Sequence, residues 1–149
     1  MKKYRSDDPN YIKVYLNDIV YLYDLPNGCN DIIFELFDYI TFNTHEIILN
    51  KTIKDRISKK IGMKLGTIDN NLTKLKQKGV LESRGRGVYF LNPYLFGKGH
   101  WKELKELREQ NLHLEITYDK NTNERVIKGS IDTQKTFNFD LEDKDKKVS

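Results

Sequence analysis

The sequence predicts an α+β fold that is mainly helical, with a winged helix-turn-helix between two leading helices and a C-terminal helix plus β-hairpin. Two stretches with helical spacing of apolar residues are separated by a glycine, and a glycine-rich basic hairpin follows them directly. The 149 residues suffice for one domain with one core. We expect that domain over residues 11–131, after a flexible N-terminus (1–10) and before a polar, disordered tail (132–149).

Two helices are expected ahead of the helix-turn-helix. Apolar residues recur at helical spacing over residues 12–23, and the Pro-Asn-Gly turn at 26–28 ends this helix. A second helix follows, in which Asn30 or Asp31 can cap the free N–H groups. This second helix is apolar on much of its circumference, which favours a surface shared with a partner subunit.

The helix-turn-helix is predicted over residues 50–78, after a short β-rich run at 46–49. Asn50 caps the first helix, and Gly62 ends it and permits a sharp turn. One small core is expected to hold the two helices at a fixed angle. Its members are Ile53, Ile57, Ile61, Met63, Ile68, Leu72 and Leu75.

Holding the second helix in this way leaves its opposite face free to enter the DNA major groove, where base edges present distinct donors and acceptors. With Ile68 at the centre of the buried face, steps of about 100° per residue place seven residues outward. They are Gly66, Thr67, Asp69, Asn70, Thr73, Lys74 and Gln77. The predicted DNA contacts on this helix are Lys64, Gly66, Thr67, Asn70, Asn71, Thr73 and Lys74.

The roles expected on this face follow from side-chain chemistry. Asn70 can pair bidentately with adenine, threonine hydroxyls can bond phosphate or base edges, and Lys74 suits phosphate. Asn71 borders the face and is the weaker candidate. Asp69 would be repelled by phosphate, so we expect it to contact a neighbouring helix or to disfavour binding to other DNA sequences. The alternative for each residue taken singly is an ordinary solvated helix position.

The hairpin over residues 80–91 is the predicted wing, with a tight primed turn that has a glycine at its first loop position. Arg84 and Arg86 are expected at its tip, where arginine is attracted to a narrow minor groove. The alternative is a plain turn with solubilising charges. Outside the wing, phosphate contacts are expected from four lysines, namely Lys51, Lys54, Lys64 and Lys78.

Charge is distributed unevenly along the chain. Residues 51–99 contain 12 Lys and Arg and 3 Asp and Glu, a net charge of +9, whereas the remaining 14 basic and 19 acidic residues give −5. A basic block between acidic segments indicates a polyanion as partner. The alternative is a lysine-rich surface that is merely solvated.

Several classes of function are not indicated by the sequence. Cys29 is the only cysteine, so no internal disulfide and no cysteine-rich zinc site is expected. His45, His100 and His113 are scattered, no glycine-rich phosphate loop is present, and no cofactor or metal is predicted. We expect no catalysis, no small-molecule substrate and no membrane partner, and we expect a cytoplasmic location, because apolar runs and a signal peptide are lacking.

With these residues in view, the chain resembles the RepL family of plasmid replication proteins from Gram-positive bacteria. The resemblance covers roughly residues 11–130. It is carried by the helix end Lys78-Gly79-Val80-Leu81, by the wing at 84–89, and by the run at 91–102, LNPYLFGKGHWK. It implies a protein required for replication of its own plasmid or a related phage, through binding at the replication origin.

One departure from the family pattern concerns the start of the second helix. Such proteins often have a serine where this chain has Lys64, which has no side-chain acceptor for capping. Gly66 costs about 1 kcal/mol relative to alanine within a helix. We therefore expect the helix start to fray until DNA phosphates reach its N-terminus.

Beyond the wing, the aromatic side chains of residues 92–101 are expected to pack back onto the winged core. The alternative is a docking surface for replication machinery. A helix is expected near 100–110, followed by strands at 112–118 and 125–131.

The sequence as a whole predicts a non-catalytic initiator that binds double-stranded origin DNA as a homodimer, with host replication proteins as further partners. A transcriptional repressor of the same fold is the first alternative, distinguished by a binding site over a promoter. A nicking initiator with a tyrosine nucleophile is the second.

Overall fold

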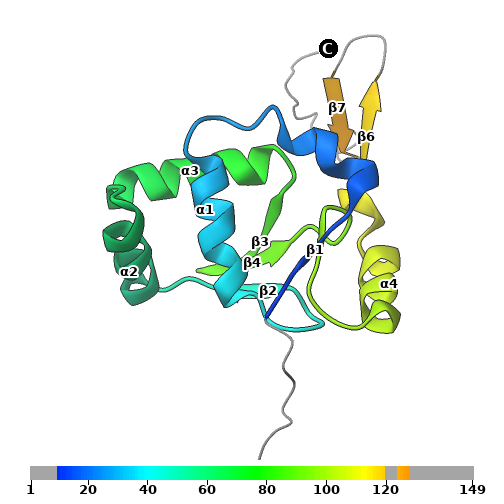
Figure 1. The fold of residues 1–149 in the computed structure, drawn as a ribbon, viewed down its shortest axis with the longest axis horizontal. Coiled ribbons are helices and arrows are strands. Elements are labelled where there is room, and N and C mark those ends of the chain that lie inside the picture. The colour runs from blue at the N-terminus through cyan, green and yellow to red at the C-terminus, as the bar shows by residue number, and fades with distance from the viewer. Residues whose placement is uncertain (1–9, 120–123, 128–149) are drawn as a thin grey trace, which may run out of the picture.

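The computed structural model describes residues 10–119 and 124–127, and its elements follow the order of a winged helix-turn-helix with a C-terminal helix and hairpin (Figure 1). Residues 1–9 of the expected N-terminal segment, residues 120–123 and all residues from 128 lie outside the described residues, and these last include the end of the predicted strand 125–131 and the tail from 132. Helix α2 (Lys51–Ile61) lies at one end of the molecule and α4 (Trp101–Gln110) lies at the other, and α3 (Leu65–Gln77), α1 (Cys29–Leu36) and a sheet lie between them (Figure 1).

The winged part consists of three α-helices and a three-stranded antiparallel sheet of order β2-β4-β3. Its α-helices are α1 (Cys29–Leu36), α2 (Lys51–Ile61) and α3 (Leu65–Gln77), and the 3-10 turn η2 (Phe37–Tyr39) directly follows α1. Its strands are β2 (Glu46–Ile48), β3 (Leu81–Gly85) and β4 (Val88–Leu91). Phe90 of the central strand β4 lies opposite Glu46 of β2 on one side and Glu82 of β3 on the other.

The first element differs from the expected α-helix. It is a short strand, β1 (Lys13–Val14), followed by the 3-10 helix η1 (Leu16–Leu22). The reason is a distant pairing, because β1 is hydrogen-bonded to β5 (Phe96–Gly97) and is thereby held extended. Leu16, expected on the apolar stripe, is 77% exposed. The expected caps of the second helix were also wrong, because α1 has Gly28 as its N-cap residue and begins ahead of Asn30.

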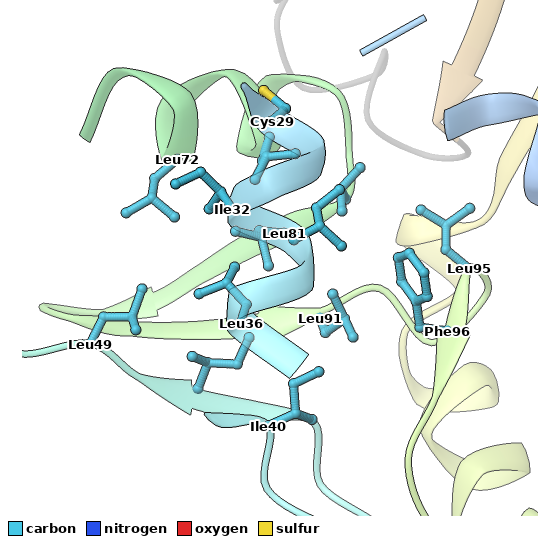
Figure 2. Packing of buried hydrophobic residues seen from close by; sticks show 14 of the residues in the cluster. Cys29, Ile32, Leu36, Ile40, Leu49, Leu72, Leu81, Leu91, Leu95 and Phe96 are labelled. Carbon is cyan, nitrogen blue, oxygen red and sulfur yellow. The ribbon is translucent and has the colours of Figure 1, made fainter. Parts of the chain in front are cut away.

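The core lies between α1, α3 and the sheet. Figure 2 shows side chains of α1, among them Ile32 and Leu36, gathered with Leu72 of α3 and with Leu81 and Leu91 of the two wing strands. The core predicted for the helix-turn-helix is confirmed. Its buried members are Ile57, Ile68, Leu72 and Leu75, and its partly buried members are Ile53, Ile61 and Met63.

The C-terminal part contains the expected helix and hairpin, but the first strand begins at Ile116 and not at Leu112, because residues 112–114 form a 3-10 turn. Its elements are α4 (Trp101–Gln110), the 3-10 turn η3 (Leu112–Leu114), β6 (Ile116–Asp119) and β7 (Glu124–Ile127), and β6 pairs with β7. Leu95 and Phe96 are buried, as expected for the run after the wing. Trp101 is 50% exposed, and it lies with Tyr15 and Tyr94 around the guanidinium of Arg108.

Asn92 attaches the C-terminal part to the end of α3. Its buried side-chain amide donates to the carbonyl of Gly79, 2.8 Å away, and to the carbonyl of Leu114, 2.9 Å away. The Asn92 Oδ1 atom accepts from the backbone N–H of Tyr94 at 2.8 Å. One side chain therefore joins three segments that are distant in sequence, and it leaves none of its polar atoms unpaired.

His45, which directly precedes β2, performs a similar role beside the end of β4. Its Nδ1 atom lies 3.1 Å from the carbonyl of Leu91, and its Nε2 atom lies 3.0 Å from the backbone N of Lys98. A carbonyl can only accept and an N–H can only donate, so the proton resides on Nδ1 and the ring is neutral. Burial lowers the pKa of His45 below its ordinary value.

Candidate nucleic-acid interface

The turn between α2 and α3 is built as the sequence predicts. The Oδ1 atom of Asn50 accepts from the N–H of Ile53 at 2.8 Å and thereby caps α2. Gly62 ends α2 with a positive φ of 68°, a conformation that glycine adopts without strain. Lys64 is the N-cap residue of α3 and makes no side-chain capping bond, as its chemistry requires.

Helix α3 has one buried face and one exposed face. The buried side chains include Ile68, Leu72 and Leu75. All seven residues predicted on the outward face are exposed, namely Gly66, Thr67, Asp69, Asn70, Thr73, Lys74 and Gln77. Of the remaining predicted contacts on this helix, Lys64 is also exposed. The exposed face therefore offers amide, hydroxyl and ammonium groups to a partner, with little apolar surface.

The structure corrects the expectation for Asn71. This residue is 2% exposed, and its amide lies 3.5 Å from the sulfur of Met63. The 100° spacing placed it at the border of the outward face, but the approach of α1 covers that border, and the Sγ atom of Cys29 lies 3.9 Å from the Asn71 carbonyl. Asn71 is thus part of the interior between α1 and α3.

Asp69 makes the contact to a neighbouring helix that was expected as one of its two roles. Its carboxylate lies 2.9 Å from the Nζ atom of Lys54 on α2. One turn later, the hydroxyl of Thr73 donates to the Asp69 carbonyl at 3.1 Å and keeps its lone pairs for another donor. Lys54 is therefore engaged in an ion pair within the protein, whereas Lys51 and Lys64 are exposed and Lys78 is partly buried.

The wing turns one residue later than the sequence suggested. Strand β3 continues through Gly85, so the two loop residues are Arg86 and Gly87, with the glycine at the second position rather than the first. Gly87 has a φ of 73°, its carbonyl accepts from the N–H of Leu49 at 2.8 Å, and a Cβ atom there would lie 3.2 Å from the Leu49 carbonyl. Glycine is required at this position, and it fixes the wing beside the start of α2.

The two wing arginines have different surroundings. Arg86 lies at the tip and is exposed, and among the described residues it has no hydrogen-bond or ion-pair partner. Arg84 lies in β3, where its guanidinium contacts Glu82, Asn111 and the ring of Phe90. The sequence placed both arginines at the tip because it does not show which of the two meets a partner from the C-terminal part.

One basic residue beside the site was not among the predicted contacts. Lys76, in the last turn of α3, is exposed, and its Nζ atom lies 6.0 Å from the centroid of the Tyr89 ring on β4. It therefore stands between α3 and the wing. Its position in the last helical turn is one where a cation stabilises the helix, so no pattern in the sequence distinguished it as part of the site.

The histidines lie apart in the structure. His45 is buried, His100 lies against the ring of Phe42, and His113 lies 2.6 Å from the carboxylate of Glu82. Within residues 10–119 and 124–127, no three side chains of His, Cys, Asp or Glu lie together as metal ligands. No helix in this part of the chain is long and apolar enough to cross a membrane.

Comparison with known proteins assigns the chain to a family. Comparisons with curated proteins and with solved structures found no match. The family model described as "Firmicute plasmid replication protein (RepL)" matches residues 1–139 of the 149. This match includes the helix-turn-helix, the wing and the C-terminal helix. The chain therefore belongs to the RepL family of Firmicute plasmid replication proteins.

Proposed function

We propose that this plasmid replication protein binds double-stranded DNA at the plasmid origin, in the cytoplasm, and has no catalysis of its own. In this proposal α3 enters the major groove, Arg86 of the wing meets the adjacent minor groove or backbone, and exposed lysines bind phosphates. Asn70 reads a base, and Thr67, Thr73 and Lys74 support it.

The observation that carries the proposal is the outward face of α3. Every residue predicted there is exposed, and Ile68, Leu72 and Leu75 on the opposite face are 0–2% exposed. A helix held this firmly presents its polar atoms at fixed positions, which reading base edges requires. The net charge of +9 over residues 51–99 supports the same partner, because phosphate contacts supply most non-specific affinity.

The first test is the effect of Asn70→Ala on binding to a duplex taken from the origin, measured by fluorescence anisotropy over a range of salt concentrations. We expect wild-type affinity to fall as salt rises. Asn70→Ala should weaken cognate binding by about 1–3 kcal/mol and relax base preference at one position, because a bidentate contact to a base edge is lost.

The matched control is Asn17→Ala, which removes an exposed asparagine from η1 and should leave affinity unchanged. Arg86→Ala provides the contrast, since losing an anchoring contact should weaken binding to most sequences alike. The assignment of roles is reversed if Asn70→Ala leaves cognate affinity intact while Arg86→Ala abolishes selectivity. Absence of salt-sensitive binding to any duplex would contradict the proposal itself.

The second test concerns catalysis. The full chain, incubated with supercoiled origin plasmid and a divalent metal ion, is expected to leave the plasmid supercoiled, because the proposed role is binding alone. Gel electrophoresis of the DNA, with and without protease treatment, measures this directly. Relaxed circles that carry a tyrosine-linked protein would show a nicking initiator instead.

The homodimer and the host replication proteins remain predictions of the sequence, and we retain the homodimer in the proposal. Two copies of α3 would occupy two half-sites of one duplex. Sedimentation of the protein with the origin duplex gives the stoichiometry, for which we expect two chains per duplex.

A further inference from the structure

We propose that Arg84 is a positioning residue of the wing. Its guanidinium is fixed against the C-terminal part of the chain, and it thereby sets the direction in which Arg86 at the tip meets DNA. The role of Arg84 in directing Arg86 toward DNA rests on the proposed DNA binding. The anchoring of the Arg84 guanidinium concerns the free protein and can be tested without DNA.

A β-bulge in the wing creates a place for such an anchor. Strands β3 and β4 pair regularly as far as Ser83 opposite Tyr89, but the register then shifts and Gly85 lies opposite Val88. The extra residue is Arg84. A bulge leaves one residue outside the ladder and bends the strand, so the ladder alone does not determine where the β3 side of the tip points. The Gly87 carbonyl, which accepts from the N–H of Leu49 at 2.8 Å, holds the β4 side of the turn.

The Arg84 side chain constrains the β3 side of the turn through three contacts. Its Nε atom lies 2.5 Å from Oε1 of Glu82, and one terminal nitrogen donates to Oδ1 of Asn111 at 2.7 Å. Its guanidinium carbon lies 3.8 Å from the centroid of the Phe90 ring. Two edges of the planar guanidinium contact Glu82 and Asn111, and one of its faces lies on the Phe90 ring. The ammonium of a lysine cannot make this set of contacts.

The three contact partners are themselves held in place. Phe90 is 1% exposed and Asn111 is 7% exposed. The amide of Asn111 donates to the carbonyl of Leu107 in α4 at 2.8 Å. The second carboxylate oxygen of Glu82 lies 2.6 Å from Nε2 of His113. Arg84 therefore ties the wing, close to its tip, to the segment that follows α4.

The competing explanation is that Arg84 acts only through its positive charge, as a direct DNA contact. The two explanations predict opposite changes in DNA affinity for Glu82→Ala. Removing a carboxylate makes the basic block more positive, so charge alone predicts tighter DNA binding. Positioning predicts weaker binding, because Arg84 loses one anchor and the β3 side of the tip, with Arg86, is held less firmly.

The chain offers a closely matched control. Glu46 lies opposite Phe90 on the other side, in β2, so it stands in the same row of the sheet as Glu82. It is exposed, and among the described residues its carboxylate has no hydrogen-bond or ion-pair partner. Glu46→Ala removes the same charge from the same row without touching Arg84.

The experiment has two arms, both with the full chain, and urea unfolding first checks that each variant is folded. In the DNA-free arm, ¹⁵N relaxation is measured for the backbone amides of residues 85–87. We expect order parameters near about 0.85 in the wild type and in Glu46→Ala, and lower values in Glu82→Ala and Arg84→Lys.

In the second arm, affinity for the origin duplex is measured at about 0.1 M salt. Each phosphate contact changes the logarithm of the binding constant by about 0.9 for a tenfold change in salt concentration. Loss of one such contact should therefore weaken binding about eightfold at this salt concentration. We expect this loss in Glu82→Ala and in Arg84→Lys, although the lysine variant keeps its charge. Glu46→Ala should bind as tightly as the wild type or slightly more tightly.

Two results would overturn the inference. One is unchanged order parameters of residues 85–87 in both Glu82→Ala and Arg84→Lys. The other is tighter DNA binding by Glu82→Ala together with wild-type affinity of Arg84→Lys, which would show that Arg84 acts by charge. A wild-type chain that binds no duplex would refute the proposed function, and the DNA-free arm would still decide whether Arg84 anchors the wing.

Discussion

Replacing Asn92 with alanine is expected to lower the free energy of unfolding by about 3 kcal/mol or more. The substitution leaves the carbonyls of Gly79 and Leu114 and the N–H of Tyr94 without their partner. A buried polar group left unsatisfied costs about 1–3 kcal/mol, and three such groups are affected, while water entering the gap offsets part of the loss. Urea unfolding followed by circular dichroism measures the change.

The control for Asn92→Ala is Asn30→Ala, an exposed asparagine on α1 for which a change within about 0.5 kcal/mol is expected. Asn92→Asp is also informative, because it keeps the acceptor for Tyr94 but replaces the donor by a carboxylate that faces two carbonyls. It should be no more stable than the alanine variant. If Asn92→Ala were as stable as Asn30→Ala, Asn92 would not be joining α3 to the C-terminal part.

The second large effect is a loss of stability in mild acid that depends on His45. Its pKa is lowered in the folded protein, chiefly by burial, so the unfolded chain takes up a proton at a higher pH than the native protein does. The stability that depends on a neutral His45 is therefore complete above its ordinary pKa of about 6.5 and is lost as the pH falls toward the folded value. Urea unfolding at pH 8 and at pH 5.5 should show this decrease.

His45→Asn separates this effect from the titration of other groups. Asparagine tolerates the positive φ of 64° at this position and can still donate to the Leu91 carbonyl, but it has no proton to gain in this range. The variant should be less stable at pH 8 by about 1–3 kcal/mol, since the N–H of Lys98 loses its acceptor. Its stability should then fall less between pH 8 and 5.5 than that of the wild type.

His100→Gln removes an exposed histidine and is the control for this experiment. It should show the same pH dependence as the wild type. An equal decrease in all three proteins would mean that His45 is not the group responsible.

The sequence was sufficient to predict the helix-turn-helix, because its determinants are local. Helical spacing places Ile57, Ile68 and Leu72 on inward faces, Asn50 caps its own helix, and Gly62 ends it. Each of these features depends on residues within a few positions along the chain. The outward face of α3 follows from the same periodicity and required no knowledge of other segments.

What the sequence did not predict depends on distant contacts. The predicted first helix is partly a strand because it pairs with residues more than 80 positions later. Asn71 and Arg84 were misplaced for the same reason, since α1 covers one and Asn111, 27 residues away, holds the other. The buried bonds of Asn92 and His45 likewise join segments that no local pattern connects.

The hydrogen bonds of Asn92 also limit how far this protein can be shortened. An engineer who excised residues 50–91 as a minimal DNA-reading module would remove the amide that pairs with the Gly79 carbonyl, immediately after α3. The cut would also discard Asn111, which holds Arg84, and His45, whose ring centroid lies 6.2 Å from that of Phe90. The smallest fragment suitable for grafting onto another protein therefore extends at least to Leu114.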